Sequence, residues 1–194
     1  VTPYTSEGKV DYKELQKLVN YLIEKGLDGF YVNGSTAEAF LLSEEERNNI
    51  IKAVVEANAG RKKVICHVGA ISTDQAIGYA KNAEKCGADA VSAISPFYYK
   101  FSEQEIIQYY QDIMSATGLP MFIYNFPNFS GFSLTEEILE KLKQNKNLIG
   151  VKFTSSDMFL LEQIKTLHPE LVVWNGFDCI FCTVPIKNLY WSST

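Results

Sequence analysis

The 194-residue sequence lacks the features that mark nucleic-acid-binding and membrane-spanning chains. Its net charge is −5 and its basic residues form no block, so nucleic acid is not an expected partner. No apolar run approaches the roughly 18 residues that a membrane-spanning helix needs, and no signal peptide is evident. We therefore expect no membrane partner. Because the chain opens at Val1-Thr2-Pro3 without a methionine, we expect its start to be missing.

Cysteine is scarce as well. Cys66, Cys86, Cys179 and Cys182 form no disulfide framework, which favours a reducing, cytoplasmic setting. Cys179 and Cys182 have the spacing of a metal or redox pair, but a second pair is absent, so we interpret the spacing as incidental. With 46% hydrophobic and 21% charged residues, the composition is that of an ordinary soluble globular domain.

Short apolar runs alternate with helical patterns along the chain. Capping patterns of the form Ser/Thr-x-x-Glu/Gln satisfy free amides at helix starts, and their serines are 29, 30 and 31 residues apart. These patterns are Ser43/Glu46, Ser72/Gln75, Ser102/Glu105 and Ser133/Glu136. Strands are predicted at 29–33, 63–68, 90–94, 121–124, 149–153 and 171–174. Helices are predicted around 15–23 and at 44–58, 73–86, 103–116, 135–142 and 157–167.

Apolar strands that do not alternate, each followed by a helix, indicate an α/β fold with a parallel sheet covered by helices. At least six such units favour a (β/α)8 TIM barrel over an open doubly wound sheet. Because a complete barrel takes about 250 residues, we expect one truncated to about the first six or seven units, incomplete at both ends. Residues 1–178 would form this barrel. Residues 179–194 show no further strand–helix pair and would form a divergent tail.

Polar residues collect at the predicted strand ends, where β/α barrels carry their active sites. Lys152 ends a buried apolar strand; burial lowers the pKa of a lysine, and a neutral lysine attacks carbonyls. Tyr124 ends the preceding strand and offers a proton relay, and the turn at Ser35 and Thr36 offers hydroxyls and amides to a carboxylate. Each of these residues also has a structural alternative. Lys152 could extend its amine to solvent, Tyr124 could be a core residue, and Ser35-Thr36 could be a turn with a helix cap.

The two histidines have simpler interpretations. No carboxylate partner can be named for His67, which we interpret as a strand-end histidine with satisfied hydrogen bonds. His168 precedes Pro169 and is predicted to end a helix. An amine, a phenol and hydroxyls would meet at the carboxyl-terminal end of the predicted barrel. These groups favour Schiff-base chemistry over metal chemistry, so we predict no metal site.

Five short motifs stand in order along the chain. They are Val1-Thr2-Pro3-Tyr4, Asn33-Gly34-Ser35-Thr36-Ala37-Glu38, Ser95-Pro96-Phe97-Tyr98-Tyr99, Tyr124-Asn125-Phe126-Pro127 and Gly150-Val151-Lys152-Phe153-Thr154-Ser155. Residues 1 to about 178 resemble, through these motifs, the pyruvate-dependent class I aldolases of the dihydrodipicolinate synthase/N-acetylneuraminate lyase family. Pro96-Phe97-Tyr98-Tyr99 and Asn175-Gly176-Phe177-Asp178 are more similar to the lyase branch.

The resemblance implies a homotetramer that acts on small molecules without a metal or an organic cofactor. Lys152 would form a Schiff base with pyruvate or open-chain N-acetylneuraminate, which would be cleaved to N-acetylmannosamine and pyruvate. Tyr124 and Ser35 would transfer protons, and Tyr98 would complete the relay of a neighbouring subunit. Ser35 and Thr36 would hold the substrate carboxylate.

The resemblance also implies that Thr154, Gly176 and Asp178 contact the sugar chain. Ala37 stands where the family commonly has glycine, and Cys179 replaces an acidic residue expected after Asp178. Two alternatives therefore stay open. One is a dihydrodipicolinate synthase-like protein or another 2-keto acid aldolase, and the other is an inactive barrel fragment.

Overall fold

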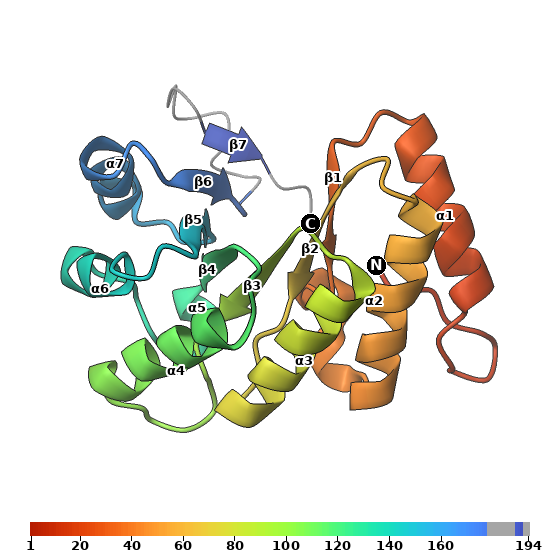
Figure 1. The fold of residues 1–194 in the computed structure, drawn as a ribbon, viewed down its shortest axis with the longest axis horizontal. Coiled ribbons are helices and arrows are strands. Elements are labelled where there is room, and N and C mark those ends of the chain that lie inside the picture. Colours follow the sequence, from red (N-terminus) through yellow and green to blue (C-terminus); the bar gives the residue numbers. More distant parts are fainter. Residues whose placement is uncertain (178–188, 192–194) are drawn as a thin grey trace.

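Within the described residues, seven parallel strands form one sheet, and their order in space is their order in the sequence (Figure 1). The computed structural model describes residues 1–177 and 189–191. The strands are β1 (Gly29–Val32), β2 (Lys63–His67), β3 (Ala90–Ile94), β4 (Met121–Asn125), β5 (Leu148–Phe153), β6 (Val172–Asn175) and β7 (Leu189–Trp191). The helices are α1 (Tyr12–Glu24), α2 (Glu44–Asn58), α3 (Thr73–Cys86), α4 (Glu103–Ala116), α5 (Pro127–Ser130), α6 (Glu136–Leu142) and α7 (Met158–Leu167), with 3-10 turns η1 (Ser35–Ala37) and η2 (Ala39–Leu41).

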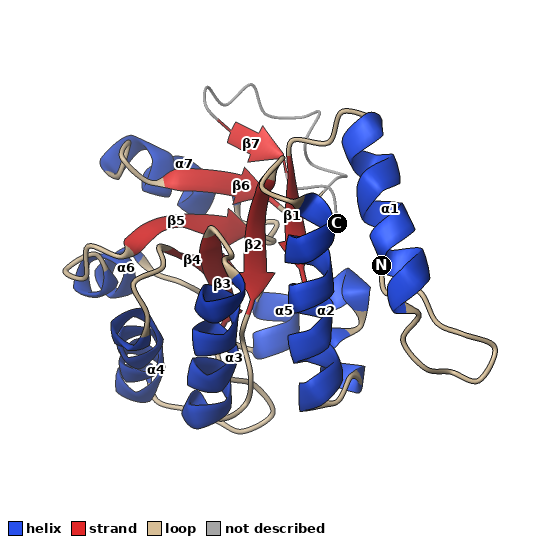
Figure 2. Cartoon of the chain, turned by 45° about the vertical axis from the view of Figure 1, so that its right-hand side comes forward, coloured by secondary structure: helices blue, strands red, loops and turns tan. Residues whose placement is uncertain are grey.

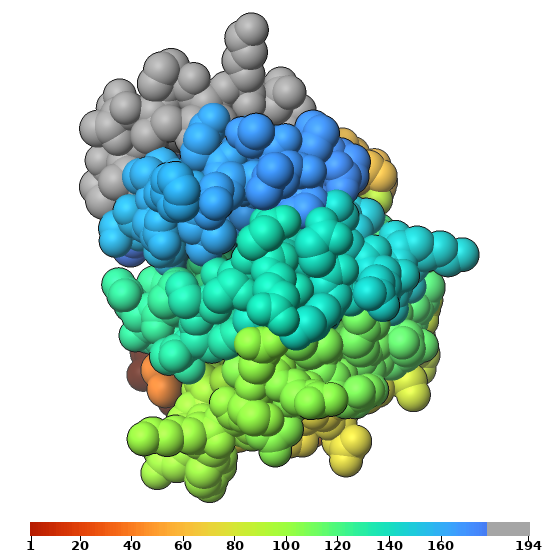
Figure 3. Space-filling view, turned by 90° about the vertical axis from the view of Figure 1, so that its left-hand side faces the viewer, coloured from red at the N-terminus to blue at the C-terminus, as the bar shows by residue number. Residues whose placement is uncertain are grey.

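The sheet curls, and the long helices lie on its outer side (Figure 2). Figure 3 shows the successive units stacked in sequence order, from the α3–α4 region in yellow-green through the α6 region in cyan to the α7 region in blue. This arrangement confirms the predicted α/β fold, a TIM barrel truncated to its first units. Within the described residues, no helix is long and apolar enough to cross a membrane.

The predicted strands and helices match the structure to within one residue at most ends. Ser43 and Ser102 form the predicted capping boxes with Glu46 and Glu105. The capping box predicted at Ser133 is wrong, because helix α6 begins two residues later, capped by the side chain of Thr135. The intervening Leu134 is buried in the core, and its N–H donates to Asn125 Oδ1, which holds the chain out of helical geometry. The short α5 was not predicted.

Strand β7 lies within the predicted tail, where no element was expected from the sequence. It pairs in parallel with β6, with Leu189 opposite Val173 and Trp191 opposite Asn175. Three residues are too few to carry a periodic signal, so only the free edge of β6 defines this strand. The tail therefore contributes to the sheet.

Side chains on the inner face of the sheet follow the two-residue period of a strand. The register places Tyr124 beside Lys152, and Lys152 beside Trp174, on neighbouring strands. On the same inner face, Phe122 stacks on Trp174 with ring centroids 4.2 Å apart. The inner face thus has an aromatic lower layer beneath a polar layer at the carboxyl ends of the strands.

Candidate active site

Lys152 is buried at the centre of the polar layer, with 2% of its surface exposed. Its Nζ lies 3.9 Å from the ring centroid of Tyr31 and 4.4 Å from that of Tyr124. In the described part of the chain, no carboxylate forms an ion pair with this amine. Burial therefore lowers the pKa of Lys152 from its ordinary 10.5 to about 8.

The lowered pKa makes Lys152 a usable nucleophile near neutral pH. With a pKa of about 8, about 9% of the amine is neutral at pH 7, against about 0.03% for an ordinary lysine. Because only the neutral amine attacks a carbonyl, the reactive fraction is about 300 times larger than in water. The site is suited to Schiff-base formation.

Tyr124 lies beside this amine on β4 and is 3% exposed. Burial raises the pKa of its phenol above 10.0, while the hydroxyls of Ser35 and Thr154 act in the opposite direction. The phenol is therefore protonated at neutral pH and close to two further hydroxyls. Such a group can pass a proton to or from a substrate next to the amine.

Thr154 supplies a buried hydroxyl close to the Tyr124 phenol. Its Oγ1 makes no well-aligned hydrogen bond within the described residues, although Thr154 is only 4% exposed. An added Cβ on Gly176 would lie 2.0 Å from that oxygen and 3.3 Å from Cε of Lys152. The absence of a side chain at Gly176 thus gives the Thr154 hydroxyl its room beside the lysine. A buried hydroxyl beside the phenol and the amine is suited to a polar substrate group.

The structure brings Lys152, Tyr124, Ser35, Thr154 and Gly176 together, and it leaves other predicted site residues apart. Thr36 follows Ser35 in η1, and its side chain is exposed. Tyr98 is 83% exposed, and its ring packs on that of Tyr99 at 4.9 Å. Asp178 lies outside the described residues, as do Cys179 and Cys182.

His67 has the satisfied hydrogen bonds that the sequence predicted. Its Nδ1 lies 3.0 Å from the Asn33 carbonyl, and its Nε2 lies 3.3 Å from the Ile94 amide, which can only donate. These partners assign the proton to Nδ1. Burial, with a smaller contribution from nearby cations, lowers the pKa of this imidazole well below 6.5. The neutral ring stands edge-on to Tyr124, with centroids 5.7 Å apart.

Tyr31 is the site residue that the sequence analysis did not identify. It lies on β1, and its hydroxyl donates to Ser92 Oγ at 3.0 Å. The signal that could have found it is the strand period, since Tyr31 shares the inner face with Tyr124 and Lys152. No sequence motif singles out Tyr31, because it contributes the face of an aromatic ring to the site and not a polar group.

An apolar pocket of about 210 Å³ opens beside Ser35. Phe40 lines it and packs on both His67 and Phe97, with ring centroids 5.7 and 4.7 Å apart. The remaining lining residues are Glu38, Leu41, Ile94 and Phe129. The pocket is suited to an aromatic or aliphatic group and not to a polyhydroxyl chain.

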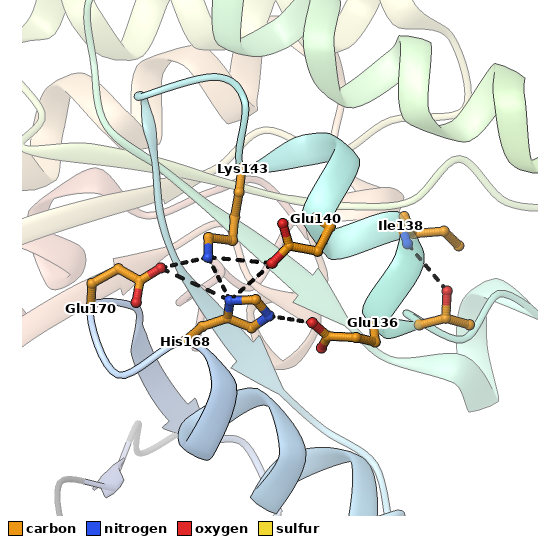
Figure 4. Close-up of polar contacts among 7 residues, drawn as sticks. Glu136, Ile138, Glu140, Lys143, His168 and Glu170 are labelled. Carbon is orange, nitrogen blue, oxygen red and sulfur yellow. Dashed lines mark hydrogen bonds and ion pairs between the residues drawn. The ribbon is translucent and has the colours of Figure 1, made fainter.

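The described residues contain one group of side chains close enough to share a metal ion: Glu136, Glu140 and His168. In Figure 4, Lys143 points into this group. Its Nζ lies 2.5 Å from His168 Nδ1 and 2.6 Å from Glu170 Oε1, while His168 Nε2 lies 2.7 Å from Glu136 Oε1. The two ring nitrogens thus face different partners, and the lysine supplies the positive charge. We interpret the cluster as an ion-pair network that joins α6 to the end of α7, where His168 stands as predicted.

Comparisons with known proteins bear on the family and fold of the chain. A sequence model described as "Dihydrodipicolinate synthetase family" matches residues 1–185, seven residues beyond the extent of about 178 that the motifs indicated. N-acetylneuraminate lyase 2 from Escherichia coli O6:H1 is 44% identical over 183 residues. The aligned region covers 94% of this chain and 60% of that protein. The chain therefore spans about three fifths of the length of this relative.

Solved structures give the same result. A structure of CdNal from Clostridium difficile in complex with mannosamine superimposes with a TM-score of 0.95 at 32% identity, over 98% of this chain and 66% of that one. Dihydrodipicolinate synthase from Acinetobacter baumannii complexed with pyruvate superimposes with a TM-score of 0.93 at 32% identity, over 100% of this chain and 67% of that one. The similarity thus extends to both branches of the family.

Proposed function

Because the chain belongs to the dihydrodipicolinate synthetase family, we propose that it is part of a class I aldolase that cleaves N-acetylneuraminate to N-acetylmannosamine and pyruvate. The observation that carries the proposal is the buried Lys152 amine, without a carboxylate partner in the described chain and beside the Tyr124 phenol. A lysine in this setting has the nucleophilicity that carbonyl chemistry requires.

In the proposed reaction, the neutral Lys152 amine attacks the ketone carbon of open-chain N-acetylneuraminate, and loss of water gives an iminium. A base then removes the proton of the C4 hydroxyl and the C3–C4 bond breaks. Its electron pair forms the C2–C3 double bond of an enamine, while the π pair of the iminium moves to the nitrogen. N-acetylmannosamine leaves as the aldehyde. Protonation of the enamine at C3 and hydrolysis release pyruvate and the amine. The iminium takes up the electron pair, so the proposal needs neither a metal nor an organic cofactor.

The polar side chains around Lys152 have roles in this scheme. Tyr124 and Ser35 carry protons between substrate and solvent, and Ser35 with the η1 turn at Thr36 holds the carboxylate. Thr154 offers its hydroxyl to the sugar chain, with Gly176 making room for that hydroxyl and Asp178 supplying a further contact. The support is the grouping of the Ser35 and Thr154 hydroxyls around Tyr124.

Tyr98 would act in a neighbouring subunit of a homotetramer. Its backbone has a φ of +76°, an uncommon conformation for a residue with a side chain, and its ring is exposed. The apolar lining of the pocket beside Ser35 suits such a ring from a second copy. Both features support a tyrosine presented to a partner.

A second candidate is a pyruvate-dependent aldolase with a different aldehyde, as in dihydrodipicolinate synthases. The high structural similarity to a synthase complexed with pyruvate supports this second candidate. The curated relative at 44% identity is a lyase, whereas the synthase structure is 32% identical, and we therefore place the lyase first. Product analysis with N-acetylneuraminate, against pyruvate plus aspartate semialdehyde, separates the two.

The Schiff base is tested by incubating the chain with pyruvate and sodium cyanoborohydride and locating the adduct by peptide mass spectrometry. We expect Lys152 to gain the mass of pyruvic acid less one oxygen atom. Lys152→Met should abolish the adduct, while Lys146→Met, at an exposed lysine, should leave it unchanged. A folded chain that gives no adduct on Lys152 would refute the proposed mechanism.

A further inference from the structure

The Lys152 nitrogen is cationic twice in the proposed reaction, first as the resting ammonium and then as the iminium. Three titratable side chains face it in the described chain: Tyr31 from β1, His67 from β2 and Tyr124 from β4. Burial raises the pKa of both phenols and lowers the pKa of the imidazole, so all three are neutral at pH 7. The cation therefore has no charged partner among these neighbours.

The Tyr31 ring is the closest aromatic group to this nitrogen. Its centroid lies 3.9 Å from Nζ, within the range of a cation–π contact. The ring is held from two sides: its hydroxyl donates to Ser92 Oγ at 3.0 Å, and Gly34 lies against its edge. An added Cβ on Gly34 would come within 2.9 Å of Tyr31 Cδ1, so a side chain there would displace the ring.

We propose that Tyr31 is a positioning residue for the Schiff-base lysine, because the face of its ring stabilises the cationic forms of the Lys152 nitrogen. The part of this inference that concerns the iminium rests on the proposed Schiff-base function. The part that concerns the resting ammonium does not. Tyr31 differs from Tyr124 in its use of the hydroxyl. The Tyr31 hydroxyl is bonded to Ser92 on β3, so the ring and not the oxygen acts on the lysine.

Two measurements test the role of the ring. Competitive acetylation between pH 6 and 10, followed by mass spectrometry of the Lys152 peptide, gives the pKa of the amine without pyruvate. Trapping with cyanoborohydride at pH 9 and subsaturating pyruvate gives the relative amount of iminium, since the amine is then mostly neutral in each variant. Circular dichroism establishes that each variant is folded.

Tyr31→Phe keeps the ring, so we expect both quantities to stay within about twofold of the unsubstituted chain. Tyr31→Leu removes the ring, so we expect the acid dissociation constant of Lys152 to rise about tenfold and the trapped iminium to fall about tenfold. Tyr21→Leu, at an exposed tyrosine on α1 that lies over Lys25, is the matched control and should change neither.

If Tyr31→Leu does not fold, phenylalanines with increasing fluorination at position 31 decide the question. Fluorine weakens the negative ring face with little change of shape, so the pKa of Lys152 should fall stepwise along the series. An unchanged pKa along the series, or an equal loss in Tyr31→Phe and Tyr31→Leu, would overturn the role of the ring. A folded chain that forms no pyruvate adduct, but in which loss of the ring still lowers the pKa of Lys152, would refute the proposed function alone.

Discussion

Replacing Lys152 by methionine should make the chain more stable while abolishing its reactivity. Methionine has nearly the length of the lysine stem and carries no charge, so it removes a buried cation without leaving a large cavity. The lysine is 2% exposed, so solvent does little to reduce the cost of burying its charge. The magnitude follows from the pKa of the amine.

Burial lowers the pKa of Lys152 from 10.5 to about 8, which corresponds to about 3 kcal/mol of destabilisation when both folded and unfolded chains are protonated. Above pH 10.5 the amine is neutral in both states, and this destabilisation disappears. As the pH falls from 10.5 to 8, the unfolded chain takes up a proton that the folded chain does not, so the folded state loses stability. Below pH 8 the loss is constant.

Urea denaturation followed by circular dichroism measures the difference. For Lys152→Met we expect a gain in the free energy of unfolding of up to about 3 kcal/mol at pH 7 and of only about 1 kcal/mol at pH 10. Lys146→Met, at an exposed position, should change it by less than about 0.5 kcal/mol at either pH. A gain that does not depend on pH, or a loss at pH 7, would show that the buried charge is not the cause.

Three further substitutions probe the sheet, the site and the ion-pair network. Gly150→Ala should lower the free energy of unfolding by about 3 kcal/mol in urea, because its Cβ would lie 2.1 Å from a carbonyl oxygen of β6; Gly78→Ala, a helical position with nothing within 4 Å, should be neutral or stabilising. Gly176→Ala should slow formation of the pyruvate adduct at least about tenfold with an unchanged circular dichroism spectrum, because its Cβ would lie 3.3 Å from Cε of Lys152 and crowd the reacting amine. His168→Phe should cost about 1–3 kcal/mol in urea by removing the ring nitrogens that join two charged partners, and an unchanged midpoint would mean that the network adds no stability.

Local sequence determined most of the secondary structure of this chain. The apolar runs located six strands closely, and the serine caps at Ser43, Ser72 and Ser102 located three helices, because capping and burial depend on residues that are near in sequence. The cap of α6 was placed two residues too early, at Ser133, because the burial of Leu134 and its bond to Asn125 depend on a neighbouring strand. Strand β7 was not foreseen, because only the edge of β6 defines it.

For the candidate site, the sequence by itself determined which chemical groups are present and that they stand at strand ends. Lys152, Tyr124 and Ser35 could be named from an apolar strand followed by a polar residue and from motifs that resemble a known family. Only the tertiary structure decided how these groups affect one another. The lowered pKa of the Lys152 amine arises from burial by segments distant in sequence, and the Tyr31 ring is brought to it across the curl of the sheet. Distances and desolvation depend on packing, and no spacing along the chain carries that information.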